Sequence, residues 1–322
     1  MSSQAAPPDY PRLRDLGGGV LQIDTMHHGN PGTIAVFVLL LPEGGYALVE
    51  TGPGVSRPAV EAGLVAAGLP MADLRFVLLT HIHLDHAGGA GALIEAGAAQ
   101  PTLIVHQVGA PHMIDPSRLM ASAERIYGDE LAWLWGAMKP VASERVRAVA
   151  GGEKVAVGGL EVEVLYTPGH ASHHVAYLLP DGSLFTGDAA AVKLAGADLI
   201  RPAVPPPDLD LESWEQSIEL MRAVKPSRLI LTHFGPVAEA DQHLAAIPAR
   251  HRSWEAEVIA GLKAGEGPEA LTARMQRLED LELRLAGVAP GIASRYRVTS
   301  DAAMTVTGLT RYLTKHHPER LV

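Results

Sequence analysis

Short apolar runs rich in β-branched residues alternate with turn residues over the first two thirds of the chain. Three such runs lie between residues 19 and 50, and they predict a meander of strands. Helical stretches at about 57–68 and 89–96 then alternate with the strand-like runs LRFVLLT and TLIVHQ. Strands that alternate with helices are typical of a layered α/β domain.

An insert separates this first half from a second set of strands. Residues from about 110 to 140 have an apolar, helical pattern that includes Trp133, Trp135 and Met138. These side chains could line an apolar pocket, but aromatic stripes are usually core, so we expect packing. Strand-like runs return as VRAVA, LEVEVLY, HVAYLLP and SLFTG, and a helical stretch at 211–224 and the run RLILTH follow. Because both halves carry strands and helices, we predict two sheets packed face to face.

The strand pattern fades beyond Gly235. Leucine and methionine recur at helical spacing between Leu271 and Leu285, and a last helical segment covers about 304–313. We therefore predict an α/β domain at 1–236, with its helical insert at about 110–140, and a helical domain at 237–322. The apolar face of these last helices could cap a site or form the contact of a homodimer.

Composition narrows the chemistry. The 322 residues include no cysteine, which excludes disulfides, thiolate metal sites and iron–sulfur clusters, so a metal must be held by nitrogen and oxygen. A net charge of −10 argues against nucleic acid as a partner. No apolar signal core occurs in residues 1–15, and the longest apolar run, residues 34–41, is far shorter than the ~20 residues that span a bilayer. We expect a cytoplasmic protein with no membrane partner.

The most informative segment, THIHLDHAGG, directly follows an apolar strand. It offers four nitrogen or oxygen donors within six positions, namely His81, His83, Asp85 and His86. Residues two apart point in different directions on a helix, so His81 and His83 can share a metal only at a strand end or in a loop. Random placement rarely gives this spacing in a chain of this length, so the segment indicates a metal site.

Three later strand-like runs end in further donors. They are His170 after TPG, Asp188 after TG and His233 after LT. Each stands next to glycine or proline or, for His233, two residues before a glycine, which is typical of loops at the rim of a rigid sheet. We expect four loops to converge on one place.

These five histidines and two aspartates, in this order, resemble the metallo-β-lactamase superfamily over about residues 19–236. The resemblance implies a four-layer αβ/βα sandwich of two mixed sheets. It also implies two divalent metal ions, zinc before manganese or iron. In the family pattern His81, His83 and His170 hold the first ion, Asp85, His86 and His233 hold the second, and Asp188 bridges them.

The turn Val49-Glu50-Thr51-Gly52 departs from that pattern. It looks like the family's Asp-Thr-Gly turn, but Glu50 stands where an aspartate usually orients a ligand histidine. A longer carboxylate could still reach a ring N–H. If it does not, the tautomer and affinity of the first site change, because such partners are often worth 10–100-fold.

The implied site predicts hydrolysis. Two divalent ions, two carboxylates and one bridging hydroxide leave a charge of about +1, which favours a small-molecule substrate that can be anionic. The hydroxide would attack an ester, thioester, lactone or phosphoester, with Asp85 as the catalytic proton carrier. Homoserine-lactone hydrolases place a tyrosine shortly after the bridging aspartate, whereas here Asp188 is followed by three alanines. This difference argues against a homoserine-lactone hydrolase.

Three other functions stay open. A mononuclear iron dioxygenase of the persulfide type resembles the same superfamily, and His81, His170 and Asp188 could supply its triad. An RNA-processing nuclease is disfavoured by the net charge and by the absence of a basic run. A non-catalytic scaffold is disfavoured because no ligand position is lost.

The remaining candidates have ordinary interpretations. We expect His173 and His174 to lie beside the ligands or at the surface, and His106 and His112 to pack or be exposed. The pairs at 27–28 and 316–317 lie outside the metal site. We expect solvated side chains, in preference to groups that hold an anionic substrate, at four positions: Arg201, Arg295, Tyr296 and Arg297.

Overall fold

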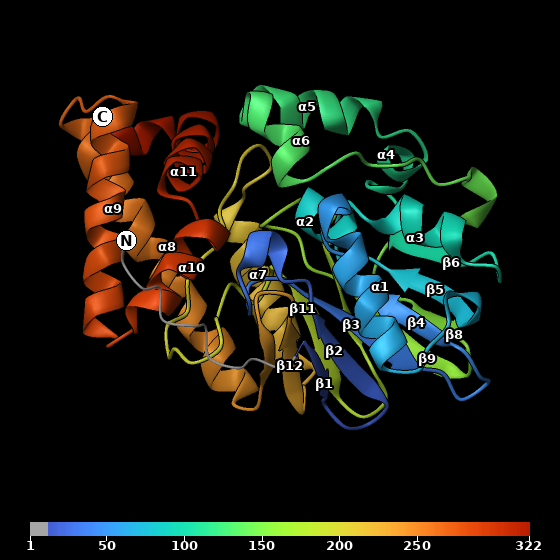
Figure 1. The fold of residues 1–322 in the computed structure, drawn as a ribbon. Coiled ribbons are helices and arrows are strands. Elements are labelled where there is room, and N and C mark those ends of the chain that lie inside the picture. Colours follow the sequence, from blue (N-terminus) through green and yellow to red (C-terminus); the bar gives the residue numbers. More distant parts are fainter. Residues whose placement is uncertain (1–11) are drawn as a thin grey trace, which may run out of the picture.

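The first of two sheets is built from the meander and the strands that follow it (Figure 1). The structure, a computed structural model, describes residues 12–322, so the prediction that residues 1–15 hold no export signal falls mostly outside the described residues. The strands lie in chain order: β1 (Leu13–Asp15), β2 (Val20–Asp24), β3 (Ala35–Leu40), β4 (Tyr46–Val49), β5 (Leu74–Leu78), β6 (Thr102–His106) and β7 (Val146–Val149). Pairing is antiparallel from β1 to β4 and parallel from β4 to β7.

The second sheet has the order β13-β12-β11-β10-β9-β8. Its strands are β8 (Lys154–Val157), β9 (Leu160–Tyr166), β10 (Val175–Leu178), β11 (Ser183–Gly187), β12 (Arg228–Leu231) and β13 (Gly235–Val237). Only the β11–β12 pair is parallel, and the connection between them contains α7 (Leu211–Ala223). The sequence pattern missed β13, a three-residue strand with a proline at its centre that pairs with β12.

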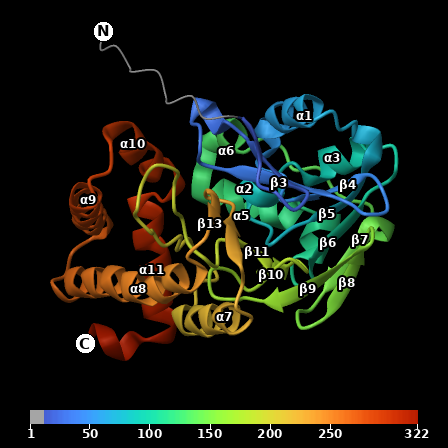
Figure 2. The ribbon, with the colours of Figure 1, turned by 90° about the horizontal axis from the view of Figure 1, so that it is seen from below.

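Helices cover the outer faces of both sheets. Figure 2 shows α1 (Arg57–Ala66) and α3 (Ala90–Ala96) on one side of the sheets and α7 on the other. Between the sheets, side chains from both inner faces form one apolar layer, in which the rings of Phe37 and Phe185 meet edge to face at 5.4 Å. The predicted αβ/βα sandwich of two mixed sheets is confirmed.

Two helical parts are added to the sandwich. The insert forms α4 (Ala110–Ile114), α5 (Ser117–Tyr127) and α6 (Leu131–Leu134), as its pattern predicts. The C-terminal part forms α8 (Ala240–Lys263), α9 (Pro268–Leu285), α10 (Pro290–Thr299) and α11 (Ala302–His316). The sequence located α9 and α11 but did not resolve α8 and α10.

The C-terminal helices share an apolar core with the second sheet. Trp254 of α8 and Leu309 of α11 belong to the same buried cluster as Trp214 of α7 and Leu229 of β12. The helical part is therefore packed onto the layer that carries several of the candidate site loops. Within residues 12–322, no helix has both the length and the apolar character that crossing a membrane requires.

Candidate metal centre

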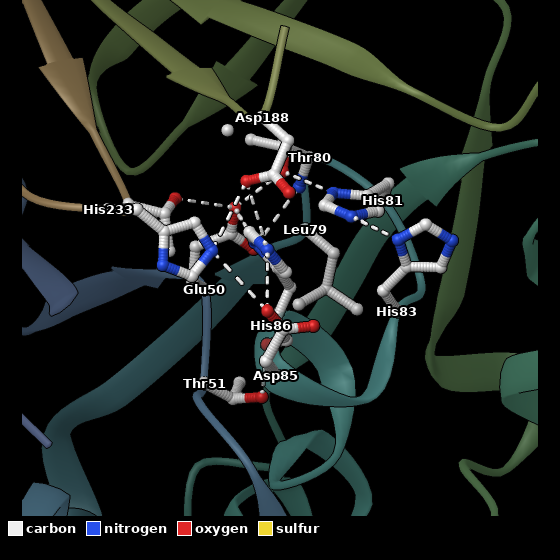
Figure 3. A network of polar contacts seen from close by, with 12 residues as sticks. Glu50, Thr51, Leu79, Thr80, His81, His83, Asp85, His86, Asp188 and His233 are labelled. Atoms are coloured by element: carbon white, nitrogen blue, oxygen red, sulfur yellow. Dashed lines mark hydrogen bonds and ion pairs between the residues drawn. The ribbon is translucent and has the colours of Figure 1, made fainter. Parts of the chain in front are cut away.

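The seven predicted donors meet at one edge of the sandwich. The segment with His81 to His86 follows β5 of the first sheet and enters the short helix α2 (Leu84–Ala87). The other three donors follow strands of the second sheet: His170 comes after β9, Asp188 directly after β11 and His233 shortly after β12. Figure 3 shows side chains from three of these four loops pointing toward one another. The predicted convergence of four loops is confirmed.

Three imidazoles form the first cluster. Nε2 of His81 lies 3.0 Å from Nδ1 of His83, and Nε2 of His170 lies 2.9 Å from that same Nδ1. The three ligand atoms are mutually within 4.8 Å, a spacing that one ion can bridge. This is the trio that the resemblance assigns to one metal.

Asp85, His86 and His233 form the second cluster. Oδ2 of Asp85 lies 3.5 Å from Nε2 of His86 and 3.3 Å from Nε2 of His233. These three ligand atoms also lie within 4.8 Å of one another.

Asp188 stands between the two clusters. Its Oδ2 lies 3.4 Å from Nε2 of His170 in the first cluster. Its Oδ1 lies 3.2 Å from Nε2 of His86 and 3.4 Å from Nε2 of His233 in the second. One carboxylate oxygen therefore faces each cluster, as a bridging carboxylate requires.

Hydrogen bonds at the far side of three rings fix their tautomers. Nδ1 of His170 donates to the carbonyl oxygen of Ala203, and Nδ1 of His233 donates to that of Thr33, each at 2.7 Å. Nδ1 of His86 lies 3.1 Å from a carboxylate oxygen of Glu50, to which it donates. With the proton on Nδ1, each neutral ring turns the lone pair of Nε2 toward the cluster, as metal ligation demands.

Two buried atoms at the centre of the site are consistent with metal binding. Nε2 of His86 and Oδ1 of Asp188 are buried and lie 3.2 Å apart, and neither makes a hydrogen bond of normal geometry among residues 12–322. Buried polar atoms are rarely left without a hydrogen bond, and ligation of a metal ion is one way to satisfy them. The donor set, nitrogen and carboxylate oxygen without sulfur, suits zinc, manganese or iron.

Electrostatics favour the ligand forms of most of these groups. Burial, reinforced by neighbouring imidazoles, holds the pKa of His81 and His83 well below the usual range, so both rings are neutral. Burial alone would raise the pKa of Asp85, but the nearby imidazoles of His86 and His233 hold it well below its usual value. Burial likewise opposes ionisation of Asp188, yet His86, His233 and His170 lower its pKa.

His86 and His233 behave in the opposite way. Burial lowers the pKa of His86, but Asp85, Asp188 and Glu50 together raise it well above the usual value. Asp188 and Asp85 similarly outweigh burial and raise the pKa of His233. Metal binding to the second cluster must therefore displace protons, which makes its affinity depend on pH.

Glu50 acts at a different ring from the one that the sequence suggested. The longer carboxylate does reach a ring N–H, but the ring is His86 of the second cluster rather than a ligand of the first. Glu50 also accepts hydrogen bonds from the hydroxyls of Thr80 and Thr232, and the Thr80 hydroxyl lies 3.1 Å from Nδ1 of His81. Thr80 thus links Glu50 to the first cluster, and a Glu50 oxygen also lies within 4.8 Å of a ring nitrogen of His81.

Histidines outside the seven surround the site. His174 is buried, and its Nε2 accepts a hydrogen bond from the backbone N–H of Asp188 at 3.2 Å. Nδ1 of His173 accepts one from the N–H of Ile82 at 3.4 Å. Both lie beside the ligands, as expected, and His106 stacks on Tyr166. No motif marked the contact of His174 with the Asp188 backbone.

The insert contributes aromatic rings that stack on two histidines outside the clusters. Trp135 stacks on His27 at 5.3 Å, and Trp133 stacks on His28 at 3.9 Å. Trp133 is nevertheless 61% exposed, so simple core packing does not describe it. Met138 is buried in the core beneath the insert, as expected.

The expectation of a solvated Arg201 is wrong. Its side chain is fully buried, its Nη2 lies 3.0 Å from a carboxylate oxygen of Glu279, and its guanidinium lies over the rings of Trp254 and Tyr296. Arg295 and Tyr296 are buried as well, because α10 turns them toward the sandwich. These residues pair with backbone and side chains that come from distant segments.

Comparisons with known proteins identify the family of this chain. The family model described as the metallo-beta-lactamase superfamily matches residues 29–233. The metallo-beta-lactamase fold-containing protein ST1585 of Sulfurisphaera tokodaii is 31% identical over 177 residues, which cover 53% of this chain and 65% of that protein. A hydroxyacylglutathione hydrolase of Methylobacillus flagellatus is 33% identical over 155 residues, which cover 47% of this chain and 46% of that protein. Thioesterase pkgB of Emericella nidulans is 27% identical over 216 residues, which cover 66% of this chain and 49% of that protein. The chain thus spans about half to two thirds of the length of these relatives.

Solved structures extend the likeness of fold to the C-terminal helices. TTHA1429 from Thermus thermophilus, a metallo-beta-lactamase family protein, superposes with a TM-score of 0.69 at 23% identity. The match covers 94% of this chain and 95% of the other. Since the family model spans more than half of the sequence, including all seven donors, this chain belongs to the metallo-beta-lactamase superfamily.

Proposed function

We propose that this protein is a hydrolase with two divalent metal ions, zinc in the first instance, and that it cleaves thioesters of small carboxylic acids. The observation that carries the proposal is the position of Asp188, which turns one oxygen to each of two clusters of ligand atoms. Nε2 of His86, which lies 3.2 Å from Asp188 and makes no hydrogen bond of normal geometry among residues 12–322, supports a second cation in addition to the first.

The ions and the protein would have separate tasks. Two bound divalent ions supply Lewis acidity and bring the pKa of water from 15.7 to about 7, which provides hydroxide as the nucleophile. Asp188 links the two clusters, and the backbone partners of His170 and His233 keep those rings oriented. Asp85 has an ionised carboxylate and a side chain that is 23% exposed, so it can pass a proton between the reacting groups and solvent.

The aromatic side of the site supports a substrate with an apolar portion. His27 is buried, and burial lowers its pKa to about 4, so its ring is neutral. The charges of Asp85 and His233 reach this ring, and Trp135 stacks on it. An apolar acyl chain or thiol substituent could pack against these rings while its carbonyl faces the clusters.

Two relatives support the choice of thioesters. One is named a hydroxyacylglutathione hydrolase and another a thioesterase. The net charge of −10 argues against nucleic acid as the substrate. We therefore place thioesters ahead of simple esters, lactones and phosphoesters.

The test begins with protein purified without added metal. Elemental analysis is followed by a panel of one acyl group presented as thioester, oxygen ester and lactone, with a phosphodiester beside them. We expect two metal ions per chain and preferred cleavage of the thioester, which a chelator abolishes and zinc restores. The proposal fails if the protein with two ions bound cleaves none of them, or if it holds one iron and consumes oxygen with a persulfide.

A further inference from the structure

The C-terminal helices contact the backbone segments that orient His170 and His233. We propose that these helices, α10 above all, position one histidine in each metal cluster, with Arg201, Ser300 and Arg295 as the positioning residues. The inference rests on the metal site of the proposed function, but it concerns ligand orientation and not the substrate.

The first contact is made by residues 201–204. The carbonyl oxygen of Ala203 in this segment accepts the hydrogen bond from Nδ1 of His170. The residue before it, Pro202, has a carbonyl that accepts a hydrogen bond from the Ser300 hydroxyl at 3.1 Å. Ala203 is therefore adjacent to a backbone group held from the end of α10.

C-terminal helices hold both ends of the same segment. At one end, Arg201 lies against Trp254 of α8, Glu279 of α9 and Tyr296 of α10. At the other, the carbonyl oxygen of Val204 would lie 1.9 Å from a Cβ added to Gly308 of α11, so the backbones are in close contact. A four-residue segment is thus fixed by four helices, and its third carbonyl orients His170.

The second contact is made by residues 31–33. The carbonyl oxygen of Thr33 accepts the hydrogen bond from Nδ1 of His233. Two residues earlier, the carbonyl of Pro31 accepts a hydrogen bond from Nη1 of Arg295 at 2.7 Å. The N–H of Gly32 between them donates to Asp24, so the short loop is held from the sheet and from α10.

His86 differs from His170 and His233 in the part of the fold that orients its ring. The ring of His86 is oriented by Glu50, which lies at the end of β4 within the sandwich. Partners that orient ligand histidines are worth roughly 10–100-fold in metal affinity. Loss of the α10 contacts should therefore weaken metal binding through His170 and His233 while the bond between His86 and Glu50 stays intact.

The experiment compares Ser300→Ala and Arg295→Met with two matched controls on the same helix. Ser294→Ala removes an exposed hydroxyl, and Arg297→Met removes an exposed guanidinium that pairs with Asp280. Imidazole N–H resonances are recorded on zinc-loaded, ¹⁵N-labelled protein and assigned from His170→Gln and His233→Gln. Zinc affinity is measured separately by chelator competition, so neither readout depends on turnover.

We expect Ser300→Ala to shift or broaden the N–H signal of His170 and to spare that of His233. Arg295→Met should do the reverse, and each should weaken the binding of one zinc ion about tenfold. Arg295→Lys, which keeps a donor, should recover part of the affinity. Ser300→Ala removes a single oxygen atom and keeps the test decisive if Arg295→Met does not fold.

The inference is overturned if both variants keep the wild-type N–H signals and bind both zinc ions within twofold of the wild-type affinity. It is also overturned, together with the proposed function, if the wild-type protein binds no metal. A wild-type protein that binds two zinc ions but cleaves no substrate of the panel would remove the proposed activity alone.

Discussion

Glu50 and His86 form a buried pair at the base of the second cluster, with 3.1 Å between the carboxylate oxygen and Nδ1 of the ring. Both side chains are fully buried. Glu50 also has a φ of 64°, a left-handed conformation that costs a residue other than glycine about 1–3 kcal/mol. Hydrogen bonds from His86, Thr80 and Thr232 to this carboxylate offset the cost of the conformation.

Glu50→Gln should weaken metal binding at the second cluster about 10–100-fold. The amide can keep Oε1 toward the ring N–H of His86 and the hydroxyls of Thr80 and Thr232, but it loses the negative charge, and its NH₂ group then faces the backbone N–H of Thr80, which is itself a donor. Zinc affinity measured by chelator competition checks this. Glu43→Gln, at an exposed position, is the control. Wild-type affinity in Glu50→Gln would show that the contact with His86 has no part in ligation.

Gly187→Ala should remove most metal binding. A Cβ at this position would lie 2.3 Å from Oγ1 of Thr80 and 2.7 Å from Nε2 of His174, so the backbone next to Asp188 must move. We expect a free energy of unfolding lower by about 1–3 kcal/mol than that of the control, measured by chemical denaturation. The control is Gly152→Ala, which also has a positive φ but meets no atom within 4 Å. Equal metal content and stability in the two variants would contradict the proposed tight packing at Asp188.

The sequence revealed the donors because they follow strands. Apolar runs with period-two character end at glycine or proline beside His170 and Asp188, and in parallel or mixed sheets such ends gather at one edge. Those local features were enough to predict the sandwich and the convergence of four loops. They carried no information about the partners that orient the rings.

Those partners were not predictable because they are backbone atoms or lie far away in sequence. Thr33 and His233 are 200 positions apart, and a carbonyl oxygen has no residue-specific signal. Arg201 looked like a solvated residue because its partner Glu279 lies in a helix whose packing the pattern does not specify. Periodicity assigns a residue to a face of a helix, but not the surface that this face contacts.

His251→Phe should make the metal-free protein less sensitive to acid. His251 is buried against Trp214, neither ring nitrogen has a partner within residues 12–322, and burial lowers its pKa from 6.5 to about 3. Below pH 6.5 the unfolded chain binds a proton that the folded chain refuses, so stability falls by up to about 1.4 kcal/mol per pH unit. This loss continues until the pH approaches the folded pKa.

Chemical denaturation between pH 7 and 4 in the presence of a chelator measures the effect. The difference between wild type and variant isolates His251, since the other titrating groups are common to both. His316→Gln, at an exposed position on α11, is the control and should follow the wild type. Parallel curves for wild type and His251→Phe would contradict the burial of a neutral imidazole.

Trp135→Ala should raise KM for a thioester with a long apolar acyl chain about tenfold and leave kcat within a few-fold. The reason is that Trp135 stacks on His27 beside the second cluster and would contact the substrate away from the reacting carbonyl. A short acetyl thioester serves as the matched substrate and should show little change. An equal rise in KM for both substrates would argue against an acyl-binding role.

The metal content of wild type and Asp188→Asn, measured by elemental analysis on folded protein, tests the central claim most directly. Asp198→Asn, an exposed position in the following loop, controls for the loss of one carboxylate. The account predicts two divalent ions per chain in wild type and in Asp198→Asn, and at most one in Asp188→Asn, because Asp188 turns one carboxylate oxygen to each cluster. Two ions retained in Asp188→Asn, or none in the wild type, would contradict it.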